Sequence, residues 1–284
     1  MTDLALQSRR YGTAAVTTLG DGVVNIPFAM LSDITEQDGT ALLQAASEPV
    51  PPRSSINAFL VQMPGHTVLI DTGAGTLMGS NGGRLRSLLA AAGVDPGAVG
   101  TVLLTHLHSD HIGGLVTDGA AAFPNAELVV HADEVAYFLD PAQEAAAPEG
   151  RRAGFARARA ALAPYAGRVR TLTGGEALPG ITAVPLPGHT PGHTGYRIGT
   201  GAEALLVWGD IVHVPVIQSA RPEVCIGFDV DPVRAAETRR QIMAQAADEN
   251  LAVAGMHMHL SGIAHVVRAG SGYRLIQENP PETA

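Results

Sequence analysis

Short apolar runs alternate with turn-forming residues along most of the chain, and this spacing predicts an α/β protein. Aliphatic and β-branched runs of strand length occur at 57–63, 67–71, 101–105, 126–131, 181–186, 204–210 and 251–257. Helical spacing occurs at 83–93, 132–140, 152–165 and 231–250. The last is the clearest helix, because Asp231 can cap it and Pro232 suits its first turn. The Pro- and Ala-rich stretches 44–55 and 141–151 are expected to be loops.

Two apolar runs share an ending. VLIDTG (68–73) and LLVWGD (205–210) both lead a buried strand into an aspartate, which suggests two similar halves. No shift in composition marks a domain boundary between them. We therefore expect one domain over residues 10–278, with flexible termini at 1–9 and 279–284.

The chemistry of the chain concentrates in THLHSDHIGG (105–114), which follows a predicted strand. His106 and His108 are two apart in extended chain, so their side chains can face one metal ion. Asp110 and His111 follow on a turn that the glycines after them permit. One ion cannot easily take four ligands from so short a loop, whereas two ions can share them.

Further ligands occur where other predicted segments end. LPGHTPGHTG (186–195) contributes His189 and His193, WGD contributes Asp210, and GMHMH contributes His257 and His259. Imidazole and carboxylate ligands without thiolate suit Zn²⁺, and also Mn²⁺, Fe²⁺ or Co²⁺.

These motifs, in this order, resemble those of the metallo-β-lactamase-fold superfamily of binuclear hydrolases. INAFLV, VLIDTGAG, FPNAELVVHADE, VWGDIVHVPVIQ and AGMHMHLSGIAHV add a closer likeness to the branch that holds methyl parathion hydrolase and quorum-quenching lactonases. The resemblance implies an αβ/βα sandwich, in which two mixed β-sheets lie face to face with helices outside. It also implies a homodimer.

The resemblance assigns seven ligands to two ions that share one carboxylate: His106, His108 and His189 for the first ion, Asp110, His111 and His257 for the second, and Asp210 between them. For the last ligand, His257 is favoured over His259, because the family places it directly after the strand. The family usually continues with a Pro-Gly turn, and Ser261 stands where that proline is common.

Several other residues near these motifs receive roles. Asp71 is expected to orient a ligand histidine, and His193 to be structural. His213, three residues after Asp210, is expected to line the pocket and to hydrogen-bond the oxyanion; a pocket wall without a catalytic role is the alternative. Cys225 is expected to be a buried thiol, and Trp208 a core residue. Phe28, Phe138 and Phe155 are expected to be core residues, with the lining of an apolar pocket as the alternative. Loops around 20–55 and 140–165 are expected to cap the pocket.

Composition narrows the choice of partners. The net charge is −9, and all eighteen basic residues are Arg, so phosphate-backbone binding is not expected. The single Cys excludes an internal disulfide. No apolar run reaches the roughly 20 residues that span a membrane, and no secretory signal is evident, so we expect a cytoplasmic protein that acts on a small molecule.

The expected chemistry is hydrolysis, since metal ions lower the pKa of bound water from about 16 to about 7. A bridging hydroxide is the expected nucleophile, and Asp110 and Asp210 are expected to act in catalysis. Asp110 in place of a Cys ligand and the absence of Lys argue against thiol-containing β-lactamases, although slow β-lactam hydrolysis stays open. A lactone of the acyl-homoserine type ranks first because aromatics are scarce at 4%. Phosphotriesters and aryl esters remain alternatives, as does a metal-binding protein without turnover.

Overall fold

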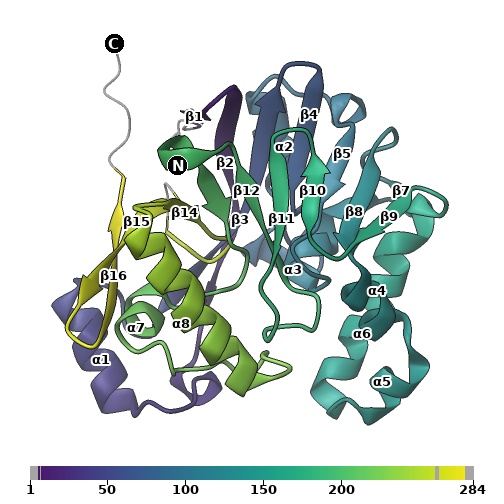
Figure 1. Ribbon diagram of the computed structural model, residues 1–284. Helices are drawn as coiled ribbons and strands as arrows, with labels where there is room; N and C mark the ends of the chain where they lie inside the picture. Colours follow the sequence, from purple (N-terminus) through teal and green to yellow (C-terminus); the bar gives the residue numbers. More distant parts are fainter. Residues whose placement is uncertain (1–5, 7, 260–261, 279–284) are drawn as a thin grey trace.

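Two seven-stranded sheets, stacked face to face, form the centre of the molecule (Figure 1). The computed structural model describes residues 6, 8–259 and 262–278. In the first sheet the strand order is β1 (Ser8–Tyr11), β2 (Ala14–Asn25), β3 (Arg53–Met63), β4 (His66–Ile70), β5 (Thr101–Leu103), β8 (Glu127–His131) and β9 (Val169–Leu172). The strands from β1 to β4 pair antiparallel, and those from β4 to β9 pair parallel.

The second sheet is antiparallel except at its middle. Its order is β10 (Gly175–Leu178), β11 (Ile181–Pro185), β12 (Thr194–Ile198), β13 (Leu205–Val207), β14 (Ala252–Ala254), β15 (Ile263–Ala269) and β16 (Gly272–Gln277). Only β13 and β14 run parallel. Each sheet thus contains an antiparallel pair followed by a parallel neighbour, β3–β4–β5 and β12–β13–β14, which agrees with the two similar halves.

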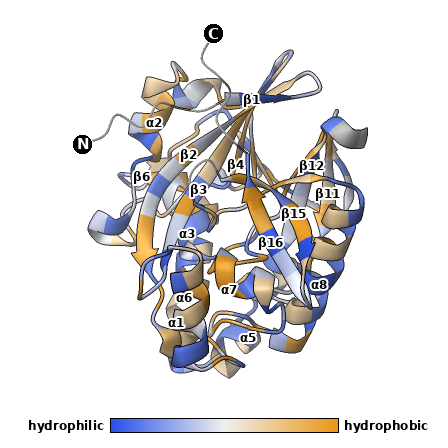
Figure 2. Ribbon diagram, turned by 90° about the vertical axis from the view of Figure 1, so that its left-hand side faces the viewer, coloured by the Kyte–Doolittle hydropathy of each residue, from blue (hydrophilic) through white to orange (hydrophobic). Residues whose placement is uncertain are grey.

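Alternating burial along the strands builds three apolar layers. In β3, Ala58 and Leu60 pack outward against helices, whereas Phe59 and Val61 pack between the sheets. Because successive side chains point to opposite faces, a strand buried on both sides reads as a continuous apolar run. In Figure 2 the central strands accordingly carry long apolar stretches.

Helices cover both outer faces, which confirms the expected αβ/βα sandwich. The first sheet packs with α2 (Leu85–Ala91), α4 (Ala132–Leu139) and α6 (Glu149–Leu162), and the second with α8 (Pro232–Asp248). A smaller cluster joins α1 (Glu36–Ala45), α7 (Pro215–Ala220) and the 3-10 turn η1 (Phe28–Met30). The remaining α-helices and strands are short: α3 (Ser109–Ile112), α5 (Pro141–Ala146), β6 (Val116–Thr117) and β7 (Ala120–Ala121). Among the described residues, no helix is both long and apolar enough to cross a membrane.

The stretch 141–151 was expected to be a loop, and this expectation is wrong. It contains α5 and the start of α6. Asp140 caps α5 by accepting the Ala142 N–H at 2.8 Å, and Pro141 occupies the first helical position. An Asp-Pro pair before alanines is therefore a helix start here rather than a loop. The other expected loop, 44–55, includes the end of α1 and the first residues of β3.

The described residues test the expected flexible termini only in part. β1 begins at Ser8, inside the stretch 1–9 that was expected to be flexible. Residues 1–5, 7 and 279–284 lie outside the described part of the chain. The single domain over 10–278 stays a prediction.

Phe59 offers a direct test of the layer between the sheets, since its side chain is completely buried there. Phe59→Ala should lower the free energy of unfolding by about 3–5 kcal/mol, because it removes apolar contacts and leaves a cavity. Urea unfolding of chelator-treated protein measures this loss. Val233→Ala is the control, since Val233 is 70% exposed and its change should stay within about 0.5 kcal/mol. Equal losses for both variants would contradict this packing.

Candidate metal centre

The candidate ligands meet at one edge of the two sheets because parallel strands end there together. Asp71 follows β4 and His106 lies just beyond β5, while Asp210 follows β13 and His257 follows β14. β4 pairs parallel with β5, and β13 pairs parallel with β14. The carboxyl ends of both pairs therefore bring four separate segments to one place.

Asp210 is at the centre of this arrangement. Its Oδ2 atom lies 3.1–3.6 Å from the Nε2 atoms of His106, His111, His189, His213 and His257. The Asp210 side chain is 2% exposed. One buried carboxylate thus faces five imidazoles.

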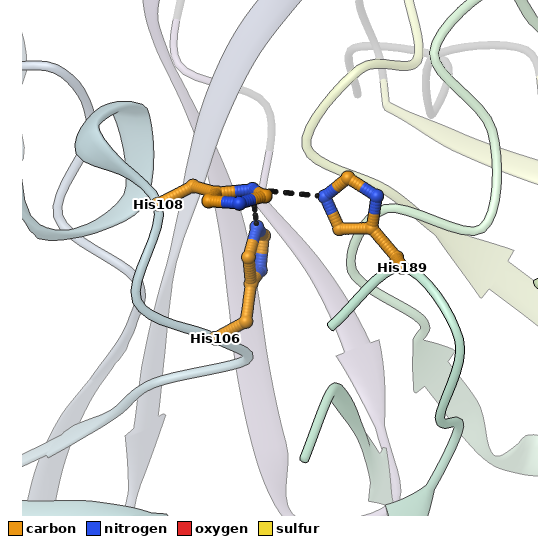
Figure 3. A group of neighbouring side chains, drawn as sticks. All are labelled: His106, His108 and His189. Atoms are coloured by element: carbon orange, nitrogen blue, oxygen red, sulfur yellow. Dashed lines mark hydrogen bonds between the residues drawn. The ribbon is translucent and has the colours of Figure 1, made fainter. Parts of the chain in front are cut away.

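Around Asp210 the proposed ligands form two groups. Nδ1 of His108 lies 3.0 Å from Nε2 of His106 and 3.0 Å from Nε2 of His189 (Figure 3). On the other side, Asp110 lies 3.7 Å from Nε2 of His111 and 3.5 Å from Nε2 of His257. Each group has donor atoms close enough to bind one metal ion together.

The outer nitrogens of four of these imidazoles have acceptors that fix the tautomer. Nδ1 of His111 donates to Asp71 at 2.6 Å, and Nδ1 of His189 donates to Asp229 at 2.8 Å. Nδ1 of His257 donates to the Ser55 carbonyl at 2.7 Å. The Thr105 hydroxyl donates to Asp71, and it accepts from His106 Nδ1 at 3.0 Å. Each Nε2 therefore directs a lone pair at the centre, as in metal sites with supporting carboxylates.

His193 positions Asp210 and is not part of either group. Its Nδ1 donates to the Leu186 carbonyl at 2.8 Å, and its Nε2 accepts the Asp210 N–H at 2.9 Å. Gly209 makes this contact possible: its φ is +60°, and a Cβ there would lie 2.3 Å from His193 Nε2. This agrees with the structural role expected for His193.

The structure separates the two late histidines. His257 faces Asp210, whereas His259 pairs with Glu48 at 3.2 Å and is 31% exposed. The Ser261 departure lies outside the described residues. His213 stacks on His257, with ring centroids 4.7 Å apart, and it lines the adjoining cavity.

Burial is the largest influence on the pKa values in this centre. It lowers the pKa of His106 and His108 well below the ordinary value. Burial also disfavours the charged forms of Asp210 and His111. Their opposite charges nevertheless prevail, so the pKa of Asp210 falls well below its ordinary range and that of His111 rises well above it. The centre thus favours a carboxylate beside positive charge.

Two observations show that these residues fit divalent cations. The lone pairs of His106 and His189 both face Nδ1 of His108, so at most one proton is available for two contacts. Asp210 Oδ1 is buried without a hydrogen-bond partner among the described residues, which is costly unless another group satisfies it. A donor set of imidazoles and carboxylates suits Zn²⁺ and similar ions.

A cavity of about 460 Å³ adjoins the centre. Asp110, Asp210, His213 and His257 line its floor. Its walls are mostly apolar, with Val24, Ile26, Met30, Met78, Tyr137, Phe138, Phe155, Phe228 and Val230, but they also include Asn25, Ser109, Arg151 and Arg157. The segments expected to cap the pocket contribute residues 24–30 and 150–157, although these are strand, turn and helix rather than loops alone.

The three Phe residues that the sequence assigned to the core in preference to the pocket do not all behave alike. Phe138 and Phe155 are 2% exposed and serve both the core and the cavity wall, whereas Phe28 packs near α1. Trp208 is buried in the core, as expected. Cys225 is also buried, and burial raises the pKa of its thiol, which does not favour a nucleophile.

Sequence reasoning missed several residues of the site. Asp229 was not singled out, although it holds His189, because it follows no recognisable motif in FDVDP. Tyr137 and Phe228 line the cavity. Arg151 donates to the Gly227 and Asp229 carbonyls at 2.6 and 3.1 Å, which joins α6 to this segment. No local signal marks such contacts, because they arise between distant segments.

Comparison with known proteins agrees with this geometry. The model of the metallo-beta-lactamase superfamily matches residues 51–257, which include every proposed ligand. The chain belongs to this superfamily and is a metal-dependent hydrolase. The resemblance found in the sequence is thereby confirmed at the level of the superfamily.

Solved structures extend the likeness over nearly the whole chain. The hydrolase AbOPH of the beta-lactamase superfamily is 36% identical, with a TM-score of 0.92 over 96% of this chain and 97% of its own. AidC, a dizinc quorum-quenching lactonase in complex with the product N-hexanoyl-L-homoserine, has a TM-score of 0.90 at 23% identity over 96% of this chain and 97% of its own. The uncharacterized protein YobT of Bacillus subtilis is 30% identical over 48% of this chain, which spans 54% of YobT.

Asp229 provides a test of the centre that the sequence motifs do not suggest. Asp229→Ala should weaken metal binding about 10–100-fold, because His189 loses the acceptor that orients it. Calorimetric titration of the apoprotein with Zn²⁺ measures the change. Asp133→Ala is the control, since the Asp133 side chain is 63% exposed. Wild-type affinity in Asp229→Ala would show that this contact does not orient a ligand.

Proposed function

We propose that this hydrolase is a binuclear lactonase that opens acyl-homoserine-type lactones, with ester and phosphotriester hydrolysis as side activities. The observation that carries the proposal is the position of Asp210. Its carboxylate lies between one group of His106, His108 and His189 and another of Asp110, His111 and His257. A carboxylate shared between two ligand groups suits a pair of ions held close together.

In this proposal the seven ligands hold two divalent ions, with Zn²⁺ first and Mn²⁺, Co²⁺ or Fe²⁺ as alternatives. Such a pair supplies an activated water at neutral pH and an electrophile for the substrate's carbonyl or phosphoryl oxygen. The chain therefore needs no Ser or Cys nucleophile.

Two residues at the cavity floor complete the chemistry. Asp110 is only partly buried and reaches the cavity, so it can accept a proton and pass it to the leaving group. Burial lowers the pKa of His213 to about 4, so its ring is neutral at pH 7 and carries one N–H. That N–H can donate to the oxyanion that forms when the carbonyl is attacked.

The shape and lining of the cavity support a substrate with an apolar tail. Its volume of about 460 Å³ is in the range of small-ligand sites. The fold shared with AidC supports a lactone. The homodimer and the cytoplasmic location expected from the sequence stay predictions, as does the absence of nucleic-acid and membrane partners.

One observation favours an aryl ester or phosphotriester as the second candidate. The sequence ranked these substrates lower because aromatic residues are scarce. In the structure, however, Tyr137, Phe138, Phe155 and Phe228 all line the cavity. Four of the twelve aromatic residues of the chain thus lie where an aromatic leaving group would stack.

The first test is proton release from a long-chain acyl-homoserine lactone by protein reconstituted with Zn²⁺, Mn²⁺ or Co²⁺ in turn. We expect rapid ring opening. Asp210→Asn should lower kcat by about 10²–10³-fold, the loss typical of removing a preorganised electrostatic group, and should lower bound metal much less.

Three outcomes distinguish the alternatives. Lactone opening that survives in Asp210→Asn would contradict the shared-carboxylate mechanism. If protein that holds two ions releases no protons from the lactone, the lactonase proposal is wrong. Phosphotriesters or aryl esters then become the proposed substrates, and the same assay can measure their hydrolysis. A protein that binds a partner in a metal-dependent way, without turnover of any of these substrates, would support the non-catalytic alternative.

A further inference from the structure

Glu134 on α4 is a fully buried carboxylate that contacts neither of the proposed ligand groups directly. Its Oε2 accepts the Leu107 N–H at 3.1 Å, and its Oε1 accepts the Gly192 N–H at 2.8 Å. We propose that Glu134 is a positioning residue that sets the distance between the two loops that hold the first metal ion. The inference rests on the metal assignment of the proposed function and adds to it.

The two bound amides lie inside the ligand loops themselves. Leu107 stands between His106 and His108, and Gly192 follows His189 by three residues. The first loop leaves β5 of the first sheet, and the second leads into β12 of the second sheet. Glu134 therefore joins loops from different sheets through the two oxygens of one side chain.

The approach of the second loop requires glycine at position 192. A Cβ on Gly192 would lie 2.6 Å from the Glu134 N atom and 3.0 Å from its Cγ atom. The backbone of this loop is thus in direct contact with α4. A larger residue at 192 would therefore require the loop that bears His189 or the start of α4 to shift.

Glu134 is not the only link between the loops, but it differs in kind from the backbone link at their bases. The Thr194 N–H donates to the Thr105 carbonyl at 2.9 Å, which connects the bases of the two loops. Glu134 acts further along, beside the ligands. Burial raises the pKa of Glu134 to about 7, while its hydrogen bonds oppose that rise. Because the carboxylate is fully buried, the loss of one of its oxygens leaves a buried N–H without an acceptor, which is costly.

The same helix also contacts a ligand and the cavity. Phe138 is four residues after Glu134, so the two side chains lie on one face of α4. The Phe138 ring stands edge-on to His108, with centroids 5.8 Å apart, and it lines the cavity. One helix face thus determines both the loop spacing and part of the cavity wall.

The substitution Glu134→Gln tests the proposal, because an amide keeps one acceptor and places an NH₂ group against the other N–H. The effect is measured in two backgrounds, each with one ligand group disabled. In His257→Ala the remaining ion reports on His106, His108 and His189. In His189→Ala the remaining ion reports on Asp110, His111 and His257.

We expect Glu134→Gln to weaken Co²⁺ binding about 10–100-fold in the His257→Ala background. In the His189→Ala background the change should be less than about threefold, because Glu134 bonds Leu107 and Gly192, which flank ligands of the first ion, whereas α3 and Asp71 hold Asp110 and His111. Visible absorption during titration of the apoprotein measures both. Gly192→Ala should reproduce the selective loss, and it provides the same test if Glu134→Gln does not fold.

Asp21→Asn is the matched control for a merely structural role. Asp21 is also a buried carboxylate, and it accepts the N–H groups of Ala74, Gly83 and Leu85. Asp21→Asn should lower the free energy of unfolding while preserving Co²⁺ affinity in the His257→Ala background. Equal losses of affinity in both backgrounds, or no loss in either, would overturn the inference.

The readout needs no substrate. If the wild-type protein binds two ions but opens no lactone, the proposed substrate is wrong, whereas the proposed role of Glu134 is unaffected. Wild-type lactonase activity together with unchanged Co²⁺ affinity in Glu134→Gln would remove the role of Glu134 alone.

Discussion

The structure depends on one buried carboxylate that positive charge must compensate. Asp210 is nearly inaccessible to solvent, and its Oδ2 atom faces five imidazole nitrogens. A carboxylate in such a place is costly unless it is paired. Among the imidazoles, the pKa of His111 rises well above its ordinary value beside Asp210, whereas burial lowers the pKa of His106 and His108. Bound cations resolve this conflict, because they use the same lone pairs and neutralise the carboxylate.

The sheets bring the ligands to Asp210, and a surrounding set of hydrogen bonds aims them. Parallel neighbours β4–β5 and β13–β14 end at one edge, so the segments after them converge. Asp71, Asp229 and the Ser55 carbonyl then fix the outer nitrogens of three imidazoles. His193 fixes the backbone of Asp210 itself. Precision therefore comes from residues that touch no substrate.

The sequence predicted those features that local patterns carry. Buried strands appear as apolar runs, and the spacing within HLHSDH follows from extended chain, so β5 and its ligands could be placed. Asp71 could be assigned because it ends a strand beside the cluster. Asp229 could not, since its partner lies 40 residues away and no motif marks it. Glu134 ends the motif FPNAELVVHADE, but its role could not be assigned because its partners lie 27 or more residues away. The helix α5 was mistaken for a loop because its Pro and Ala residues were read as loop composition rather than as a capped helix start.

The lining of the cavity also depends on contacts between distant segments, which local sequence patterns do not reveal. Phe138 was assigned to the core, yet a helix residue can support the core with one edge of its ring and the cavity with the other. Phe228 belongs to a segment held by Arg151 from α6, and only the folded chain reveals that contact. Composition alone understated how aromatic this cavity is.

The most direct measurement of the central claim is anomalous X-ray diffraction from crystals of the zinc-loaded protein, recorded on both sides of the zinc absorption edge. Two anomalous peaks are expected about 3.5–4 Å apart, one on each side of the Asp210 carboxylate. The first should lie among His106, His108 and His189, and the second among Asp110, His111 and His257. A single peak, or a pair that does not share Asp210, would contradict it.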